Sequence, residues 1–205
     1  MYHVTKYKEF FFYNFIDTRH MNNHFSIIVA YCTNGGIGFK GRIPWSIPGD
    51  LQHFYYTTTT TRDPQKQNAV VMGRNTWQSL PKKPLPKRRN VIISTSSQDM
   101  RGQEVYPSLD SALSVLWREN DIENIFVIGG QRLYEEAITH PMCKHAYVTV
   151  VHNNYDCDVF FPRNKLYQPN EWKETECSAP FKTIDAVSYS FLKFERVASP
   201  RNIDI

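Results

Sequence analysis

The feature that most constrains the fold is a series of short apolar runs, rich in Val and Ile, separated by segments of helical character. Five runs are nearly continuous in apolar residues: Phe25–Tyr31, Asn68–Met72, Asn90–Ser94, Asn124–Ile128 and His145–Val151. Such runs are typical of strands buried on both faces, as in a parallel sheet covered by helices. A sixth run, Val187–Phe194, alternates apolar and polar residues, which indicates an edge or antiparallel strand.

Helices are expected in the segments between these strands. The candidates are Pro48–Tyr56, Asn75–Leu80, Leu109–Arg118 and Gln131–Ile138, and the polar segments Thr57–Lys66 and Lys82–Arg89 are expected to be surface loops. This order predicts an α/β fold: one domain with a mainly parallel, doubly wound central sheet, flanking helices and a C-terminal antiparallel hairpin.

The length, composition and charge of the chain limit the classes of protein to which it can belong. Its 205 residues suit one domain, and the 41% hydrophobic content allows a sizeable core. The net charge of +4 is too small to indicate nucleic-acid binding, although it suits an anionic small ligand. The four cysteines show no spacing typical of a zinc site, so we expect reduced thiols in a cytoplasmic protein and no metal.

The ends of the chain are expected to lie outside the domain, which we assign to residues 25–196. Residues 1–24 form an N-terminal extension of uncertain structure, and residues 197–205 form a tail. Phe10–Ile16 is apolar but too short to span a membrane, and no signal-peptide cleavage site follows it. The extension is interpreted as a docking strand or helix, a disordered tail, or translated sequence upstream of a start at Met21.

The segment after the first strand carries the first candidate chemistry. A glycine-rich loop at 35–38 precedes Trp45, and Asp50 follows in the first turn of the predicted helix. Phe54 lies four residues later and therefore on the same helix face as Asp50. A carboxylate beside an aromatic ring suits a flat, amide-like heterocycle. The alternative is that Asp50 only offsets the helix dipole at the surface, which is the commoner case for an isolated acid.

Two further turns and one arginine are candidate anion sites. Gly73 and Arg74 stand where a buried strand passes into a helix, and Gly129–Gly130 stand at a second such junction. Free N–H groups at a helix start bind phosphate, although many turns of this kind bind nothing. Arg88 is suited to hold a carboxylate through paired hydrogen bonds, or it is part of a solvated basic loop.

The order of these motifs along one chain resembles that of dihydrofolate reductases. The ordered set is I-V-A, G-I-G, P-W with an acid five residues after the Trp, V-V-M-G-R-N-T-W, P-L-P-K-R-R-N-V-I-I-S, V-I-G-G-x-x-L-Y, Y-V-T and D-V-F-F-P. The resemblance extends from about Phe25 to Arg196. As an ordered set it is highly specific, whereas each motif alone is modest.

The resemblance implies a role for each matching position. Asp50 would hydrogen-bond the pterin ring, Thr149 would join that network, and Trp45 would hold an ordered water nearby. The substrate-binding residues would be Ile28, Val29, Asp50, Leu51, Phe54, Leu80, Leu85, Ile128, Tyr134 and Thr149, with Arg88 on the glutamate α-carboxylate. The cofactor-binding residues would be Ala30, Ile37, Gly38, Gly73, Arg74, Asn75, Thr76, Ser94, Thr95, Ser96, Gly129, Gly130, Gln131, Arg132, Leu133 and Tyr134. The resemblance also implies a cis peptide bond between Gly129 and Gly130.

The chemistry implied is reduction of 7,8-dihydrofolate to tetrahydrofolate with NADPH as cofactor. Hydride would pass from nicotinamide C4 to pterin C6, and N5 would take a proton from water. Such an enzyme supports one-carbon metabolism and is a target of antifolate-type inhibitors. The active-site acid is an Asp, and its spacing after the Trp is typical of bacterial and some protist members of the family. Thr95 stands where many vertebrate members have Arg, so a preference for NADPH would rest on Arg74 and nearby hydroxyls.

Other interpretations stay open from sequence. The chain could be the reductase part of a bifunctional protein with thymidylate synthase, a reductase of the riboflavin pathway, or a non-catalytic homologue that binds ligand or RNA. The set of Asp50, Trp45 and Thr149 favours the enzyme, and no aromatic and basic platform for nucleic acid is evident. We expect a monomer unless it is joined to thymidylate synthase, with no nucleic-acid or membrane partner.

Overall fold

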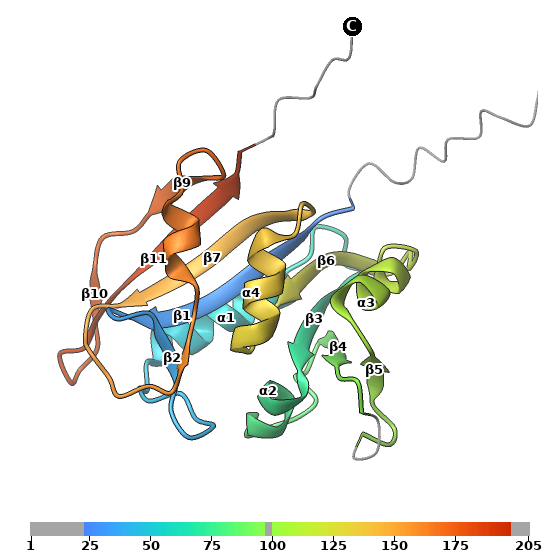
Figure 1. Ribbon diagram of the computed structural model, residues 1–205, viewed down its shortest axis with the longest axis horizontal. Coiled ribbons are helices and arrows are strands. Elements are labelled where there is room, and N and C mark those ends of the chain that lie inside the picture. The colour runs from blue at the N-terminus through green and yellow to red at the C-terminus, as the bar shows by residue number, and fades with distance from the viewer. Residues whose placement is uncertain (1–22, 97–99, 198–205) are drawn as a thin grey trace, which may run out of the picture.

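The computed structural model describes residues 23–96 and 100–197 (Figure 1). Within them, nine strands form one sheet in the order β10-β11-β7-β1-β6-β3-β4-β5, with β9 paired to β11. The strands of this sheet are β1 Phe25–Cys32, β3 Gln67–Gly73, β4 Arg88–Ile93, β5 Glu104–Tyr106, β6 Ile122–Val127, β7 Cys143–Val151, β9 Trp172–Cys177, β10 Phe181–Lys182 and β11 Ser188–Arg196. A separate two-stranded ribbon pairs β2 Gly36–Gly38 with β8 Val159–Phe160.

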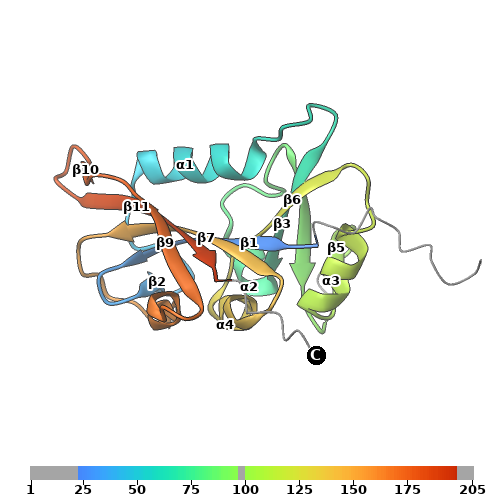
Figure 2. The ribbon, with the colours of Figure 1, turned by 90° about the horizontal axis from the view of Figure 1, so that it is seen from above.

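In the part of the chain that the structure describes, four α-helices and one short 3-10 helix accompany the sheet. They are α1 Pro48–Thr59, α2 Arg74–Ser79, α3 Leu109–Leu116, α4 Gln131–Thr139 and the 3-10 helix η2 Arg163–Tyr167. Figure 2 shows α1 on one side of the sheet and α3 and α4 on the other. The six central strands from β7 to β5 pair in parallel, so the predicted doubly wound α/β fold is confirmed.

The apolar runs form two cores because successive side chains of a strand point to opposite faces. In β1, Ile27 and Val29 pack in the core on the side of α3 and α4. Ile28, between them, packs in a second core with Phe54 of α1 and Trp77 of α2. All three β1 side chains are buried, which explains why the run has no polar alternation.

Helix α1 is longer than the sequence suggested. Pro48–Tyr56 was expected and Thr57–Lys66 was expected to be a loop, but the helix continues to Thr59. Threonine is a weak helix former, so its local preference favours an earlier end. Thr58 is fully buried and donates a hydrogen bond to Phe54 O (2.7 Å), and this burial offsets the weak propensity.

The expected loop Lys82–Arg89 also ends early. Arg88 and Arg89 are the first residues of β4, and they pair in parallel with Asn68 and Ala69 of β3. In sequence, two adjacent arginines are typical of a solvated loop, whereas pairing with β3 places them in the sheet.

The C-terminal part is antiparallel, as expected, but contains more than a hairpin. Strand β11 pairs with β7 and β10, and β9 adds a further antiparallel partner. Strand β9 has one buried side chain, that of Trp172, so it has no apolar alternation from which it could be predicted. The interpretations of residues 1–22 and 198–205 lie outside the described residues. Among the described helices, none has the length and apolar character needed to cross a membrane.

Candidate active site

The candidate site lies at the carboxyl ends of the parallel strands. Strands β1 and β6 are neighbours, but the chain leaves β1 through α1 on one face and leaves β6 through α4 on the other. Where neighbouring strands send their connections to opposite faces, the connections separate and leave a crevice, which is where α/β proteins bind ligands. The candidate residues on β1, α1, β6 and β7 therefore converge at one edge of the sheet.

Asp50 is positioned by the start of α1. Pro48 occupies the first turn, where the lack of an N–H has no cost, and Asp50 N donates to Ile47 O (3.0 Å). Burial raises the pKa of the Asp50 carboxyl, and a hydrogen bond with Thr149 of β7 partly opposes that rise. Asp50 is partly buried and hydrogen-bonded to Thr149, which favours the pocket interpretation over that of a fully solvated acid at the helix start.

The apolar side chains beside Asp50 come from five different elements or loops. One cluster on the α1 side of the sheet contains five of the residues expected to be pocket walls: Ile28, Phe54, Leu80, Leu85 and Ile128. The side chain of Val29, another expected wall residue, packs in the core on the opposite face, and Leu51 is 59% exposed on α1.

Tyr134 connects this pocket to α4. Its hydroxyl donates to Ile28 O (2.8 Å) across the sheet edge. Burial raises the pKa of Tyr134, and the nearby Asp50 carboxylate raises it further, so the Tyr134 hydroxyl stays neutral next to Asp50. Tyr134 therefore lies between the acid on α1 and the turn that begins α4.

Trp45 supplies a buried polar atom without a partner. Its ring packs with Ile47, Tyr155 and Ala30 of β1, and only 9% of the residue is exposed. The indole Nε1 has no hydrogen-bond partner among the described residues. A buried donor of this kind costs free energy unless a water or ligand accepts its hydrogen bond, so Trp45 suits the water-holding role.

Arg88 is held in a defined orientation and is not part of a solvated loop. It is only 7% exposed, its Nη1 donates to Thr58 Oγ1 (2.7 Å), and its Nε donates to Pro86 O (3.0 Å). The guanidinium carbon lies 5.6 Å from the Phe54 ring centroid and 5.5 Å from that of Tyr55. Burial lowers the pKa of Arg88, although the group stays charged at neutral pH. Its remaining N–H groups are therefore suited to a carboxylate at this end of the pocket.

The two glycine turns meet at the other end of the site. Gly73 N donates to Gly129 O (2.7 Å), which joins the end of β3 to the turn after β6. The Gly129–Gly130 peptide bond is cis, as the resemblance implied. A methyl group on Gly130 would lie 3.1 Å from Thr76 Oγ1, so a side chain there would fill the space between the turns. The two turns thus form one cradle of main-chain groups.

The remaining cofactor candidates surround this cradle. Ser94 follows Ile93, the β4 residue that pairs with Gly73, and its hydroxyl donates to Ser96 O (2.7 Å). The other polar candidates are exposed or partly exposed: Arg74, Asn75, Thr76, Thr95, Gln131 and Arg132. Leu133 is buried in the core and anchors α4. Main-chain N–H groups, hydroxyls and arginines at helix starts form a donor set that fits a dinucleotide phosphate cofactor.

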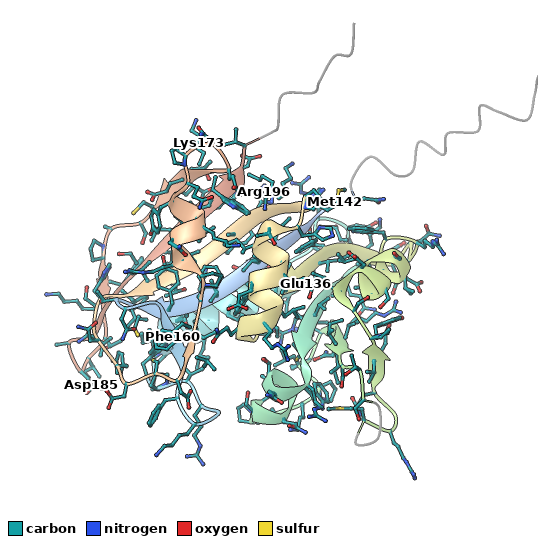
Figure 3. The ribbon with its side chains drawn as sticks, in the orientation of Figure 1. Glu136, Met142, Phe160, Lys173, Asp185 and Arg196 are labelled. Carbon is teal, nitrogen blue, oxygen red and sulfur yellow. The ribbon has the colours of Figure 1, made fainter. Side chains whose placement is uncertain are left out.

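The ribbon of β2 and β8 borders the same edge. It carries Ile37 and Gly38, and Gln131 at the start of α4 accepts a hydrogen bond from Phe160 N (2.9 Å). Phe160, labelled in Figure 3, lies on the β8 side of this ribbon, near α4. This contact connects the ribbon to the Gly129–Gly130 turn.

Two supporting residues were missed by sequence reasoning. Thr58 orients Arg88, but its place in a run of threonines suggested a loop. Asp158 holds the loop after β2: its carboxylate accepts from Lys40 N (2.8 Å), and its N–H donates to Gly38 O (3.0 Å). The D-V-F-F-P motif contains Asp158 and was the available signal, but it did not reveal the contact.

Comparison with known proteins agrees with this geometry. Residues 24–196 match the family model described as dihydrofolate reductase. A dihydrofolate reductase of Drosophila melanogaster is 46% identical over 143 residues, covering 67% of this chain and 79% of the fly protein. One of Heliothis virescens is 34% identical over 179 residues, covering 84% of this chain and 97% of the moth protein.

A two-activity relative aligns as well. The bifunctional dihydrofolate reductase-thymidylate synthase 2 of Arabidopsis thaliana is 39% identical over 197 residues, which cover 91% of this chain but only 34% of the plant protein. The match of the family model over nearly all described residues, together with the convergence of Asp50, Thr149 and the two glycine turns, shows that this chain belongs to the dihydrofolate reductase family.

Proposed function

We propose that this chain catalyses the NADPH-dependent reduction of 7,8-dihydrofolate to 5,6,7,8-tetrahydrofolate. The observation that carries the proposal is the Asp50 carboxyl, desolvated beside an apolar cluster and hydrogen-bonded to Thr149. A flat heterocycle with adjacent ring N–H and amino donors would satisfy this carboxylate while its rings pack on Phe54 and Ile28.

Asp50 orients the pterin and favours its protonated form. A carboxylate in a partly apolar setting interacts more strongly with a nearby positive charge than it would in water. Thr149 fixes the carboxyl through its hydroxyl, and the buried β7 backbone fixes Thr149. Trp45 Nε1 holds a water close to the pocket, which is the proton source for pterin N5.

Arg88 binds the glutamate α-carboxylate at the opposite end of the pocket. Its contacts with Thr58 and Pro86 hold the guanidinium in place before substrate arrives, so less side-chain freedom is lost on binding. The substrate is thereby held at two points, Asp50 and Arg88, with apolar walls between them.

The cradle of Gly73, Arg74 and Gly129–Gly130 would hold the phosphates of NADPH, and the hydroxyls of Ser94 and Thr95 would lie beside the adenosine phosphate. When bound, NADPH supplies the hydride. Ile37 and Gly38 of the ribbon exclude water from the reacting face. The free thiols of all four cysteines, which fall within the described residues, support a reducing compartment such as the cytoplasm.

The test is a spectroscopic assay of the full chain. Loss of the near-ultraviolet absorbance of NADPH is expected on addition of dihydrofolate, and a diaminopyrimidine inhibitor, which offers the same donor pattern to Asp50, should abolish it. Absence of NADPH oxidation by folded protein would contradict the proposal. Binding of both ligands without turnover would indicate a non-catalytic homologue instead.

A further inference from the structure

Two cysteines lie in contact at the base of the ribbon. Cys32, the last residue of β1, and Cys157, between β7 and β8, have sulfur atoms 3.9 Å apart. They are 125 residues apart in sequence and do not have C-x-x-C spacing, so no sequence motif indicates that they are in contact. Cys32 is fully buried and Cys157 is partly exposed. The proposed reaction uses neither thiol.

We propose that Cys32 and Cys157 are an oxidation site, at which a small disulfide compound closes an intramolecular disulfide bond that slows turnover. The effect on turnover rests on the proposed function, whereas formation of the bond does not. A disulfide has an S–S length of about 2.05 Å, so the two sulfurs must approach by roughly 2 Å. A change of this size is within the range of side-chain rotation and small loop movement.

Because Cys157 is partly exposed and Cys32 is buried, the Cys157 thiol reacts with the oxidant first. The Cys157 thiolate attacks one sulfur of the oxidant, forms a mixed disulfide and expels the first small thiol. The Cys32 thiolate then attacks the Cys157 sulfur, forms the Cys32–Cys157 bond and expels the second small thiol. The cysteines lose two electrons and two protons, and the oxidant, a low-molecular-weight disulfide, gains both and becomes two thiols.

The surroundings of the pair make the exchange slow and selective. Burial and the adjacent Cys32 raise the pKa of the Cys157 thiol to about 11, so the reactive thiolate is scarce at neutral pH. The Cys32 thiol donates to Asn34 Oδ1 (3.0 Å), which keeps Cys32 turned toward the loop that carries the glycines. The exchange is therefore expected to be slow at neutral pH.

Closing the bond would act on the ribbon through two direct contacts. Cys157 lies against Gly36 so closely that a methyl group on Gly36 would overlap the Cys157 side chain. The next residue, Asp158, holds Lys40 N and Gly38 O. Displacing Cys157 toward β1 would therefore shift Gly36 and Gly38, which border the cofactor half of the site.

The first experiment measures the bond itself. The full reduced chain is incubated with oxidised glutathione, digested without reductant and examined by mass spectrometry. We expect a peptide pair joined through Cys32 and Cys157 with the loss of two hydrogens. Cys157→Ser and Cys32→Ala should each abolish it, and the matched control Cys177→Ser, at an exposed cysteine, should leave it intact. A stable glutathione adduct on Cys157 without the internal bond would overturn the proposal.

The second experiment measures turnover before and after oxidation. We expect kcat to fall by roughly fivefold or more and to recover with dithiothreitol, and the fall should be absent in Cys157→Ser. If the bond forms but kcat changes by less than about twofold, the regulatory half of the proposal is wrong. If the reduced chain oxidises no NADPH, the proposed function fails, and with it the turnover effect, while the mass measurement still decides whether the oxidation site exists.

Discussion

The proposed pterin side and the proposed cofactor side of the site are built from different parts of the chain. On the proposed pterin side, the polar groups belong to individual side chains, those of Asp50, Thr149 and Arg88. The buried Thr149 holds Asp50, and the buried Thr58 holds Arg88. On the cofactor side, the central feature is main chain, where Gly73 and Gly129 join through their backbone groups. The pterin side requires particular functional groups, whereas the cofactor side requires glycines, which have no side chain.

This difference predicts opposite responses to mutation. Removing a functional group should damage the pterin side and leave the cofactor side intact. Adding a methyl group should damage the cradle and leave the pterin side intact. The four predictions below test this contrast, from the largest expected effect to the smallest.

Asp50→Asn should lower kcat/KM for dihydrofolate by about 100-fold or more, because the variant loses the charge that orients and favours the protonated pterin. NADPH affinity should change little, since the cradle lies across the site. Steady-state kinetics and a fluorescence titration with NADPH measure the two effects. Turnover at the wild-type rate would remove Asp50 from its assigned role.

Arg88→Leu should weaken dihydrofolate binding by about 10- to 100-fold, because hydrogen bonds to a charged group usually contribute that much to affinity. Arg89→Leu is the matched control, because Arg89 is adjacent but pairs with Glu104 (2.8 Å) and Glu119 (3.4 Å). Calorimetric titrations of both variants with each ligand provide the measurement. Equal loss of folate and NADPH affinity in Arg88→Leu would indicate general damage to the fold instead.

Gly130→Ala should weaken NADPH binding by about tenfold, because the added methyl group would lie 3.1 Å from Thr76 Oγ1 in the cradle. Gly130 has a φ of −84°, outside the left-handed region that favours glycine, so the expected effect comes mainly from the space that the methyl group fills. Dihydrofolate affinity, measured in the same preparation, should stay close to wild type. A variant with unchanged NADPH affinity would show that no ligand occupies this space.

Asp50→Asn should stabilise the ligand-free protein by about 1 kcal/mol near pH 7–8, roughly 2–4 °C in Tm. Folding raises the pKa of Asp50 above its ordinary value of 3.8, so the folded protein favours the neutral acid. That contribution to stability is complete below pH 3.8 and is lost as the pH rises through the folded-state pKa. The gain from the variant should therefore shrink toward pH 4 in thermal melts. A gain that is equal at both pH values would contradict the desolvation of Asp50.

The sequence by itself determined the layered fold and the positions of the glycine turns. Both depend on local patterns: continuous apolar runs are expected only of strands covered on both faces, and a strand that meets glycines before a helix forms a tight turn wherever it stands. Pro48 was also enough to place Asp50 in the first turn of α1. Strand β9 was not predictable, because its single buried residue, Trp172, makes no periodic pattern.

Only the tertiary structure decided which groups meet. The residue chemistry left Asp50 as either a surface acid or a pocket acid, and its partly buried position beside Thr149, 99 residues later in the chain, favours the pocket. From sequence, Arg88 also suited a solvated loop. In the structure, Thr58, Phe54 and Tyr55 enclose it. The pairing of Cys32 with Cys157 likewise has no local signal. Desolvation and hydrogen bonding act between neighbours in space, so they fix the chemistry of a residue only after the chain has folded.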